Sequence, residues 1–293
     1  MNSKNILFSP SDPTYSLQPT AYSLPFVTLT IAGSDCSSGA GIQADLKTFG
    51  AFGCYGLTVV TCVVAEVPGK VLSIQPIDLP TIRDQLLTLL ESFPIAAIKT
   101  GMLFSTPIIE MVAEILSALK NPPPLIVDPV MVASSGDPLL ESDALIAYRE
   151  KLFPIASLIT PNLDELILMT KSSSQLRSLK AMHTAGKKLL TELNVPLLLK
   201  GGHLQSEVAT DILLMPDGTE QTFTAPFYQN RETHGTGCTY SAAITAGLAR
   251  GASLIEAVSE AKKFITHAIA HGFQWKKVGA LNQLTSPYTI SLK

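Results

Sequence analysis

The chain has 293 residues, of which 46% are hydrophobic and only 15% are charged, and its formal net charge is −3. A chain of this length can bury a large hydrophobic core, in one domain or in two. The slightly acidic balance argues against a nucleic-acid partner, because nucleic-acid-binding domains normally carry a basic face. Its four cysteines form no CxxC pair and no regular framework, so neither a zinc site nor a disulfide scaffold is indicated.

The N-terminal segment 1–25 is rich in Pro, Ser and Thr and has neither an apolar periodicity nor the apolar core of a signal peptide. We expect a loosely ordered extension there, followed by a single domain over residues 26–293. The longest apolar run, Leu57 to Ala65, is about half of the ~18 residues that suggest a membrane span. These features predict a soluble, cytoplasmic protein with no membrane partner.

Short, continuous apolar runs predict strands that are covered on both faces, as in a parallel sheet. The runs are rich in β-branched residues or leucine, and Gly, Pro or Asn closes them. The predicted strands are 26–33, 56–65, 96–103, 124–130, 157–162 and 196–202. A further stretch, 210–226, has two β runs on either side of Asp217-Gly218, which predicts a tight hairpin.

Segments with apolar residues three to four positions apart lie between these runs and predict helices. The predicted helices are 42–52, 81–93, 106–119, 142–153, 175–193, 237–250 and 253–271. Repeated β-α units imply right-handed crossovers and a doubly wound α/β sheet. Ligands of such sheets bind at the carboxyl ends of the strands, and the unusual residues of this chain fall there.

The sequence HGTGC, which begins at His234, leads directly into the predicted helix 237–250. Gly235 and Gly237 would leave backbone N–H groups free to converge at a helix N-terminus, which can hold an anion. Cys238 follows in the first turn, where the partial positive charge of the helix should favour its thiolate. The alternative is an ordinary glycine-rich connection followed by a small core cysteine, because Gly-x-Gly turns are common.

The sequence SLITPNLDEL places Asn162 and Glu165 three residues apart after a predicted strand. At that spacing both side chains can lie over the first helical turn, facing the strand end. An amide beside a carboxylate suits Mg²⁺, which keeps much of its hydration shell. The same residues also make a good helix N-terminus, so a helix cap is the alternative interpretation.

Charged residues close or follow three other predicted strands. Lys200 ends LLLK, which would bring its ammonium to the ligand edge as a phosphate contact, or merely to solvent. Asp128 ends LIVD, where its carboxylate could help to balance the charge of a metal ion or a phosphate, or could cap the next turn. The small residues of AGSDCSSGAG would let a substrate approach the backbone, and the following helix carries Asp45. This segment fits neither a Walker A loop nor GxGxxG.

Two other signals carry less weight. His267 and His271 have the spacing of a zinc pair, but they lack a neighbouring Glu and a third ligand, so we expect surface histidines. Cys54 and Cys62 are expected to be small apolar residues of the core.

From about Val27 to Gly272 the chain resembles the hydroxymethylpyrimidine and phosphomethylpyrimidine kinases of the ribokinase-like superfamily. The motifs that carry the resemblance occur in the family order: TIAGSD, SGAGIQADLKTFG, KTGML, DPVMV, SGDPLL, ITPNLDE, KGGH and HGTGC. The resemblance implies a three-layer sandwich with a mostly parallel central sheet and helices on both faces, usually a homodimer. It also implies an enzyme that uses MgATP to phosphorylate the hydroxymethyl group of 4-amino-5-hydroxymethyl-2-methylpyrimidine in thiamin synthesis. Whether the monophosphate is a further substrate stays open.

The resemblance also implies roles for individual residues. Gly235, Thr236 and Gly237 would form the anion hole for the transferring phosphoryl group, and Cys238 would be the base where most of the superfamily has Asp. The ATP phosphates would be contacted by Lys200, Asn162 and Asp128, and Mg²⁺ would be held through water by Glu165 and Asn162. The residues that would line the pyrimidine pocket are Gly33, Asp45, Glu66, Met102 and Val130. Residues 133–138 resemble the flap that closes over the substrate.

Three positions depart from the family pattern. Glu66 stands where the family usually has Gln, Ser38 replaces a usual Gly, and Ser134 replaces a lysine frequent in the flap. An ionised Glu only accepts hydrogen bonds, whereas an amide also donates them, so Glu66 bears on which ring is bound. A pyridoxal kinase of the same superfamily is therefore the first alternative, since pyridoxal also presents a hydroxymethyl group on a nitrogen heteroaromatic ring. A ligand-binding regulator without turnover is the second.

Overall fold

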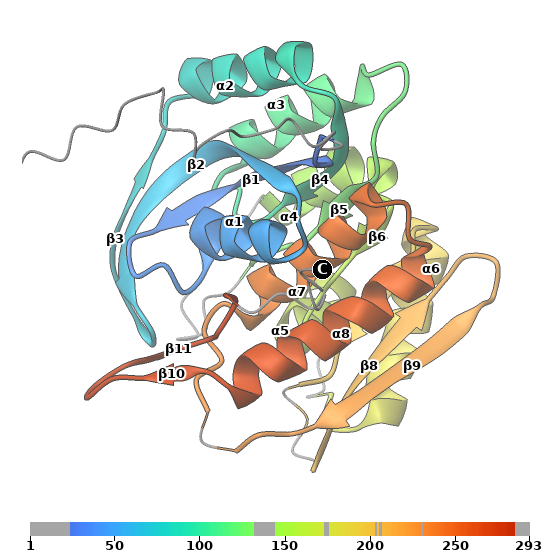
Figure 1. Ribbon diagram of the computed structural model, residues 1–293. Coiled ribbons are helices and arrows are strands. Elements are labelled where there is room, and N and C mark those ends of the chain that lie inside the picture. Colours follow the sequence, from blue (N-terminus) through green and yellow to red (C-terminus); the bar gives the residue numbers. More distant parts are fainter. Residues whose placement is uncertain are drawn as a thin grey trace, which may run out of the picture.

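A nine-stranded sheet forms the centre of the computed structural model, which describes residues 24–131, 144–172, 176–202, 204, 207–229 and 231–284 (Figure 1). The strand order is β3-β2-β1-β4-β5-β6-β7-β8-β9. The strands are β1 Val27–Asp35, β2 Tyr55–Val67, β3 Lys70–Pro76, β4 Ile95–Thr100, β5 Leu125–Val127, β6 Leu158–Ile159, β7 Leu197–Lys200, β8 Val208–Leu214 and β9 Glu220–Pro226.

The middle of the sheet, from β2 to β7, is parallel, as the continuous apolar runs predicted. β1 is buried along nearly its whole length, because helices cover both of its faces. Both margins are antiparallel: β3 pairs with β2, and β8 and β9 continue from β7. The strand β3 was not predicted from the sequence, because it lies at the sheet edge, is mostly exposed and therefore lacks a buried apolar run.

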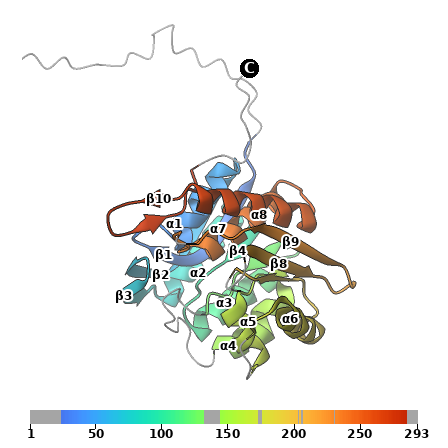
Figure 2. The ribbon, with the colours of Figure 1, turned by 90° about the horizontal axis from the view of Figure 1, so that it is seen from below.

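Helices cover both faces of the sheet and complete the three layers that the sequence predicted (Figure 2). One face carries α2 to α6 over a large cluster of buried aliphatic side chains, and the other carries α1, α7 and α8. The long helices are α1 Gly41–Ala51, α2 Leu79–Ser92, α3 Thr106–Ser117, α5 Leu163–Thr170, α6 Leu179–Leu193, α7 Thr236–Ala249 and α8 Leu254–Ala270.

The helix expected over 142–153 is broken into shorter pieces. Within its described part, α4 Ala144–Ala147 runs into a π-helical turn, η2 Tyr148–Leu152, and then into the 3₁₀ turn η3 Phe153–Ile155. Pro154 lacks the N–H that a continuing helix requires. The helix expected over 175–193 begins only at Leu179, because the Ser178 hydroxyl caps it by accepting from the N–H of Ala181 at 3.2 Å.

The hairpin predicted at Asp217-Gly218 is confirmed between β8 and β9. Gly218 has φ 89°, which favours glycine, and the Asp217 carboxylate accepts from the N–H of Thr219 at 2.8 Å. A second small hairpin, β10 Phe273–Gln274 with β11 Gly279–Ala280, was not expected from the sequence. Among the helices of the described residues, none combines the length and apolarity needed to cross a membrane.

Candidate active site

A cavity of about 1160 Å³ lies at the carboxyl ends of the parallel strands, beside the start of α7. The sequence-predicted site residues come together there although they are spread along most of the chain. Those that line the cavity are Gly33, Glu66, Met102, Asp128, Val130, Asn162, Glu165, Lys200, Gly235, Thr236, Gly237 and Cys238. Asp45 is the exception among the predicted residues. The predicted flap, residues 133–138, and Ser134 within it lie outside the described residues.

The glycine turn is shaped by backbone requirements. Gly235 is the N-cap of α7 and has φ 80°, a left-handed conformation that side chains rarely adopt. A Cβ atom at this position would lie 1.9 Å from the carbonyl oxygen of Gly39, so the turn and the loop after β1 approach closely. The N–H of Thr236 donates to the Thr233 carbonyl at 3.0 Å, whereas the next N–H groups of α7 have no partner within the helix and belong to residues that line the cavity, which makes them a candidate site for negative charge.

Lys200 and Asp128 form a fixed pair beside this turn. The Lys200 Nζ lies 2.8 Å from Asp128 Oδ1, which also accepts from the Thr160 hydroxyl at 3.2 Å, while Ser241 donates to the other oxygen at 3.1 Å. Burial alone would raise the pKa of Asp128, but the ammonium groups of Lys200 and Lys99 outweigh it and hold the pKa below its ordinary value. The lysine is therefore held charged at the cavity wall.

Asn162 and Glu165 cap α5, as the alternative interpretation of these residues predicted. The Asn162 side chain accepts from the Glu165 N–H at 2.9 Å, and the Glu165 carboxylate accepts from the Asn162 N–H at 2.8 Å. Glu165 also accepts from the backbone of Met131 at 3.3 Å. Burial raises the pKa of Glu165 to about 7, although the Lys200 ammonium lowers it.

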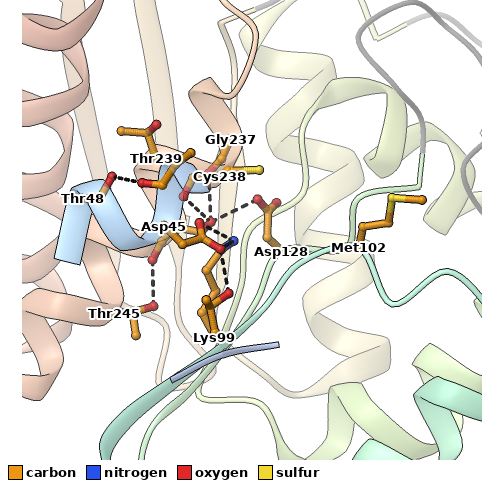
Figure 3. Close-up of polar contacts among 12 residues, drawn as sticks. Asp45, Thr48, Lys99, Met102, Asp128, Gly237, Cys238, Thr239 and Thr245 are labelled. Carbon is orange, nitrogen blue, oxygen red and sulfur yellow. Dashed lines mark hydrogen bonds and ion pairs between the residues drawn. The ribbon is translucent and has the colours of Figure 1, made fainter. Parts of the chain in front are cut away.

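The structure places Asp45 behind the cavity wall rather than on it. Its carboxylate is 0% exposed, and both of its oxygens accept from the Lys99 ammonium at 2.8 Å; the Thr30 hydroxyl donates to one of them at 2.6 Å (Figure 3). Asp45 is thus occupied by a buried cation. Lys99 belongs to the KTGML motif, but its partner is not predictable from the sequence, because a lysine inside an apolar run gives no sign of which carboxylate it will meet.

Cys238 faces the cavity from the first turn of α7, but its thiolate is not favoured as expected. The pKa of Cys238 is raised to about 12, chiefly by burial; the Lys99 ammonium lowers it, and the carboxylates of Asp45 and Asp128 add to the rise. Loss of hydration at the base of the cavity therefore outweighs the helix N-terminus. In this state Cys238 is a thiol at neutral pH.

A second charged cluster lies where β1 and β2 end. His234 Nε2 lies 3.1 Å from Asp35 Oδ2, and Glu66 is close to both. Burial alone would lower the pKa of His234, but Asp35 and Glu66 raise it. Asp35 already accepts from the Ser37 hydroxyl and from the N–H groups of Ser37 and Ala40. Because these donors occupy its oxygens, the cluster fits a protonated histidine between two carboxylates better than it fits a metal ion.

A further lobe of the cavity was missed by the sequence analysis. It extends from Lys200 past a buried ion pair, Lys262 with Asp211 at 2.6 Å, to apolar side chains of α8 and of the segment after β9. The described residues that line this lobe include Tyr228, Ile265 and Ile269. Lys262, Ile265 and Ile269 are three and four residues apart, so the helical spacing alone could have grouped them on one face.

Comparisons with known proteins agree with this geometry. The phosphomethylpyrimidine kinase family matches residues 35–282. The hydroxymethylpyrimidine/phosphomethylpyrimidine kinase of Haemophilus influenzae is 45% identical over 251 residues, which is 83% of this chain and 90% of that protein. The pyridoxine kinase of Bacillus subtilis is 42% identical over 265 residues, or 88% of this chain and 93% of that protein. The solved pyridoxal kinase of Staphylococcus aureus with AMP-PCP and pyridoxal has a TM-score of 0.81 at 34% identity, covering 90% and 95% of the two chains.

The three-layer fold and the cavity at the strand ends define a small-molecule kinase of the ribokinase-like superfamily. Within that class, the chain belongs to the phosphomethylpyrimidine kinase family, since the match spans most of its length.

Proposed function

We propose that this enzyme transfers the γ-phosphoryl group of ATP to the hydroxymethyl group of 4-amino-5-hydroxymethyl-2-methylpyrimidine, a step of thiamin synthesis. One observation carries the proposal: the start of α7, with Cys238, opens onto the same cavity wall as the Lys200–Asp128 pair. A base, a backbone anion site and a fixed cation around one point are what phosphoryl transfer requires, because its catalysis is mostly positioning and charge stabilisation.

In the transfer step, the thiolate form of Cys238, which is the minor form in the protein without ligands, takes the proton of the hydroxymethyl group. The substrate O–H bond breaks and an S–H bond forms; the oxygen attacks the γ-phosphorus, and the bond to the β-γ bridging oxygen breaks. ADP leaves with that electron pair. The N–H groups at the start of α7 and the Lys200 ammonium would face the equatorial oxygens, on which the transition-state charge is spread.

The residues around Glu165 fit a magnesium ion. Glu165 is 2% exposed, and its raised pKa reflects a buried carboxylate that shares the single Lys200 ammonium with Asp128. A second cation would complete the charge balance of this group. Glu165 and Asn162 would hold the ion through water, and Mg²⁺ would neutralise charge on the phosphates.

The lobe beside α8 would take the base and ribose of ATP, since it combines apolar walls with the Lys262–Asp211 pair. AMP-PCP, which the related Staphylococcus aureus enzyme binds, is an ATP analogue and supports this use of the cavity.

The other end of the cavity would take the pyrimidine. Gly33 lines this end, and a Cβ atom there would lie 2.9 Å from the Sγ of Cys62, so the close packing of the cavity wall on Cys62 requires a glycine. Val130 has φ 42°, a costly conformation for a β-branched residue that is typical of functional sites. Met102 and Glu66 complete this end, and we propose that Asp45 acts on the pocket from behind the wall, through Lys99.

Pyridoxal is the second candidate substrate. It is favoured by the pyridoxine kinase of Bacillus subtilis and the pyridoxal kinase of Staphylococcus aureus, both of which align with most of this chain. Glu66 argues for the pyrimidine, because an aminopyrimidine offers an exocyclic NH₂ as donor, whereas the phenolate of pyridoxal would face an ionised carboxylate.

We further propose a cytoplasmic homodimer built from one kinase domain. Exposed apolar side chains on β2 and β3, Val63, Val67 and Leu72, offer a face for a second copy. The continuous nine-stranded sheet supports a single domain. Light scattering of the purified protein would give the oligomeric state directly.

The test of the proposed function is product identification. The enzyme is mixed with MgATP and either vitamer, and the product is analysed by mass spectrometry and ³¹P NMR. We expect one ADP for each molecule of pyrimidine phosphate ester, with phosphorus coupled to the hydroxymethyl protons. A chain that binds the pyrimidine but forms neither ADP nor ester would be a ligand-binding regulator, and the proposal would fail.

A further inference from the structure

The buried Lys99–Asp45 pair lies directly under the reacting end of the cavity. Lys99 is on β4 and Asp45 is on α1, and both side chains are 0% exposed. Removing a carboxylate and an ammonium from water costs free energy that their attraction often fails to recover, so well-packed apolar residues could fill the same space. A buried ion pair is thus weak evidence for a purely stabilising role.

The position of the ammonium relates it to the cavity. Gly101 lines the cavity floor, and a Cβ atom there would lie only 3.2 Å from Lys99 Nζ. Because Gly101 has no side chain, the Lys99 ammonium lies immediately beneath the cavity floor, although the lysine itself is not exposed. In Figure 3, Asp45 and Lys99 point toward one another next to Cys238 and Asp128.

The charges around Cys238 differ in sign and come from several elements. Lys99 on β4 favours its thiolate, and the N–H of Gly41 at the start of α1 assists. Asp45 on α1 and Asp128 after β5 oppose it. Lys200 on β7 also interacts with Cys238, but among the charges that favour the thiolate Lys99 has the largest effect. Lys99 is thus the cation on which the thiolate chiefly depends.

We propose that Lys99 is a positioning residue of the kinase reaction: its ammonium, fixed by both oxygens of Asp45, is the counter-charge that allows Cys238 to act as a thiolate base. This inference rests on the proposed role of Cys238. Asp45 has two opposed effects in this arrangement, because it holds the lysine in place while its own negative charge disfavours the thiolate.

These opposed effects make the inference testable in the protein without nucleotide or vitamer. Iodoacetamide reacts with the thiolate, so its rate at fixed pH follows the thiolate fraction of Cys238. The rate is measured from pH 7 to 10 by mass spectrometry of the Cys238 peptide, which separates it from the exposed Cys36.

Lys99→Met should slow alkylation at pH 9 by about tenfold or more, which corresponds to one unit or more of thiol pKa. Lys99→Arg keeps the charge and should stay within about threefold of the parent. Asp45→Asn removes the opposing charge and should accelerate alkylation. Lys187→Met is the control, because it breaks a Lys–Glu pair, with Glu220, whose lysine lies on α6 and does not line the cavity, and it should leave the profile unchanged.

Damage to the fold would move Lys99→Met and Asp45→Asn in the same direction, so only opposite shifts support the proposal. A same-direction shift, or a profile that Lys99→Met leaves unchanged, overturns it. Should Lys99→Met fail to fold, Asp45→Asn decides alone: slower or unchanged alkylation overturns the inference. The outcome is separate from that of the proposed function, because alkylation is measured without turnover, whereas an active Cys238→Ala enzyme would remove Cys238 as the base.

Discussion

The two ends of the cavity differ in how completely their polar groups are paired. At the end proposed to bind the ATP phosphates, the phosphate end, Asp128 accepts hydrogen bonds from Lys200, Thr160 and Ser241. Asn162 and Glu165 accept from each other's backbone N–H groups. At the end proposed to bind the pyrimidine, the vitamin end, the Glu66 carboxylate accepts no hydrogen bond from any residue that the structure describes.

This difference separates chemistry from substrate choice. A prepared set of donors and charges at the phosphate end needs no rearrangement when charge develops in the transition state. The Glu66 carboxylate at the other end has His234 nearby but accepts no hydrogen bond from a described residue, so it can accept one from a ligand donor and thereby discriminate between rings. Substitutions at the phosphate end should therefore lower turnover, whereas those at the vitamin end should change which substrate is used and at what pH.

Cys238→Ala should have the largest effect. Loss of a general base is expected to lower kcat by about 10²–10⁴ and to leave nucleotide affinity nearly unchanged. Steady-state kinetics and ADP titration measure the two quantities. Cys54→Ala is a suitable control, since that cysteine is buried elsewhere in the core, and near-normal turnover of Cys238→Ala would remove this residue as the base.

Gly235→Ala and Gly237→Ala should differ sharply although they are two residues apart. At Gly235 a side chain meets both a left-handed φ and the Gly39 carbonyl, so we expect a loss of about 1–3 kcal/mol from backbone strain alone, and more from the clash. At Gly237 a Cβ would lie 3.2 Å from Lys200 Nζ, which can shift. Thermal unfolding should show a large drop only for Gly235→Ala, while Gly237→Ala should mainly raise the KM for ATP.

The Mg²⁺ requirement should depend on pH through Glu165. Its pKa is raised to about 7, so protons compete with the metal below that pH. The Mg²⁺ concentration for half-maximal rate should rise by up to about tenfold per pH unit below 7 and level off above it. The Glu165→Gln enzyme should need more Mg²⁺ for half-maximal rate at every pH, and this Mg²⁺ concentration should no longer vary with pH. An unchanged Mg²⁺ titration in the variant would place the ion elsewhere.

Glu66→Gln should have the smallest effect and act on substrate recognition. Burial and the Asp35 carboxylate raise the pKa of Glu66, so its charge changes at a higher pH than for an ordinary Glu. As the pH falls, Glu66 of the parent enzyme becomes protonated and the enzyme's KM for the pyrimidine should rise. The KM of the Glu66→Gln variant should vary less with pH. We expect a change in KM of a few-fold and little change in kcat; the reverse pattern would assign Glu66 to the chemical step.

Much of the fold was predictable from the sequence because buried parallel strands produce continuous apolar runs. The strands β1, β2 and β4 to β7 were anticipated on this basis, and so was the hairpin at Asp217-Gly218. The edge strand β3 and the break in the helix around Pro154 were not, since an exposed edge lacks the apolar signal and a π-helical turn has no distinct spacing.

The sequence predicted which residues form the site better than it predicted their ion pairs and pKa values. Strand ends and glycine turns identified residues such as Lys200 and Gly235, because the carboxyl ends of parallel strands converge. The pairing of Asp45 with Lys99 joins residues 54 positions apart and has no local pattern. The thiol pKa of Cys238 depends on burial, which the helix N-terminus alone did not indicate.

The most direct test of the central claim compares the two vitamers on the same enzyme. The value of kcat/KM is measured for 4-amino-5-hydroxymethyl-2-methylpyrimidine and for pyridoxal with saturating MgATP across pH 6–9. We predict that the pyrimidine is the better substrate throughout this range, because its exocyclic NH₂ can donate to Glu66, whereas the phenolate of pyridoxal would face the carboxylate unfavourably. A higher kcat/KM for pyridoxal at every pH would contradict the account and assign the enzyme to vitamin B6 salvage.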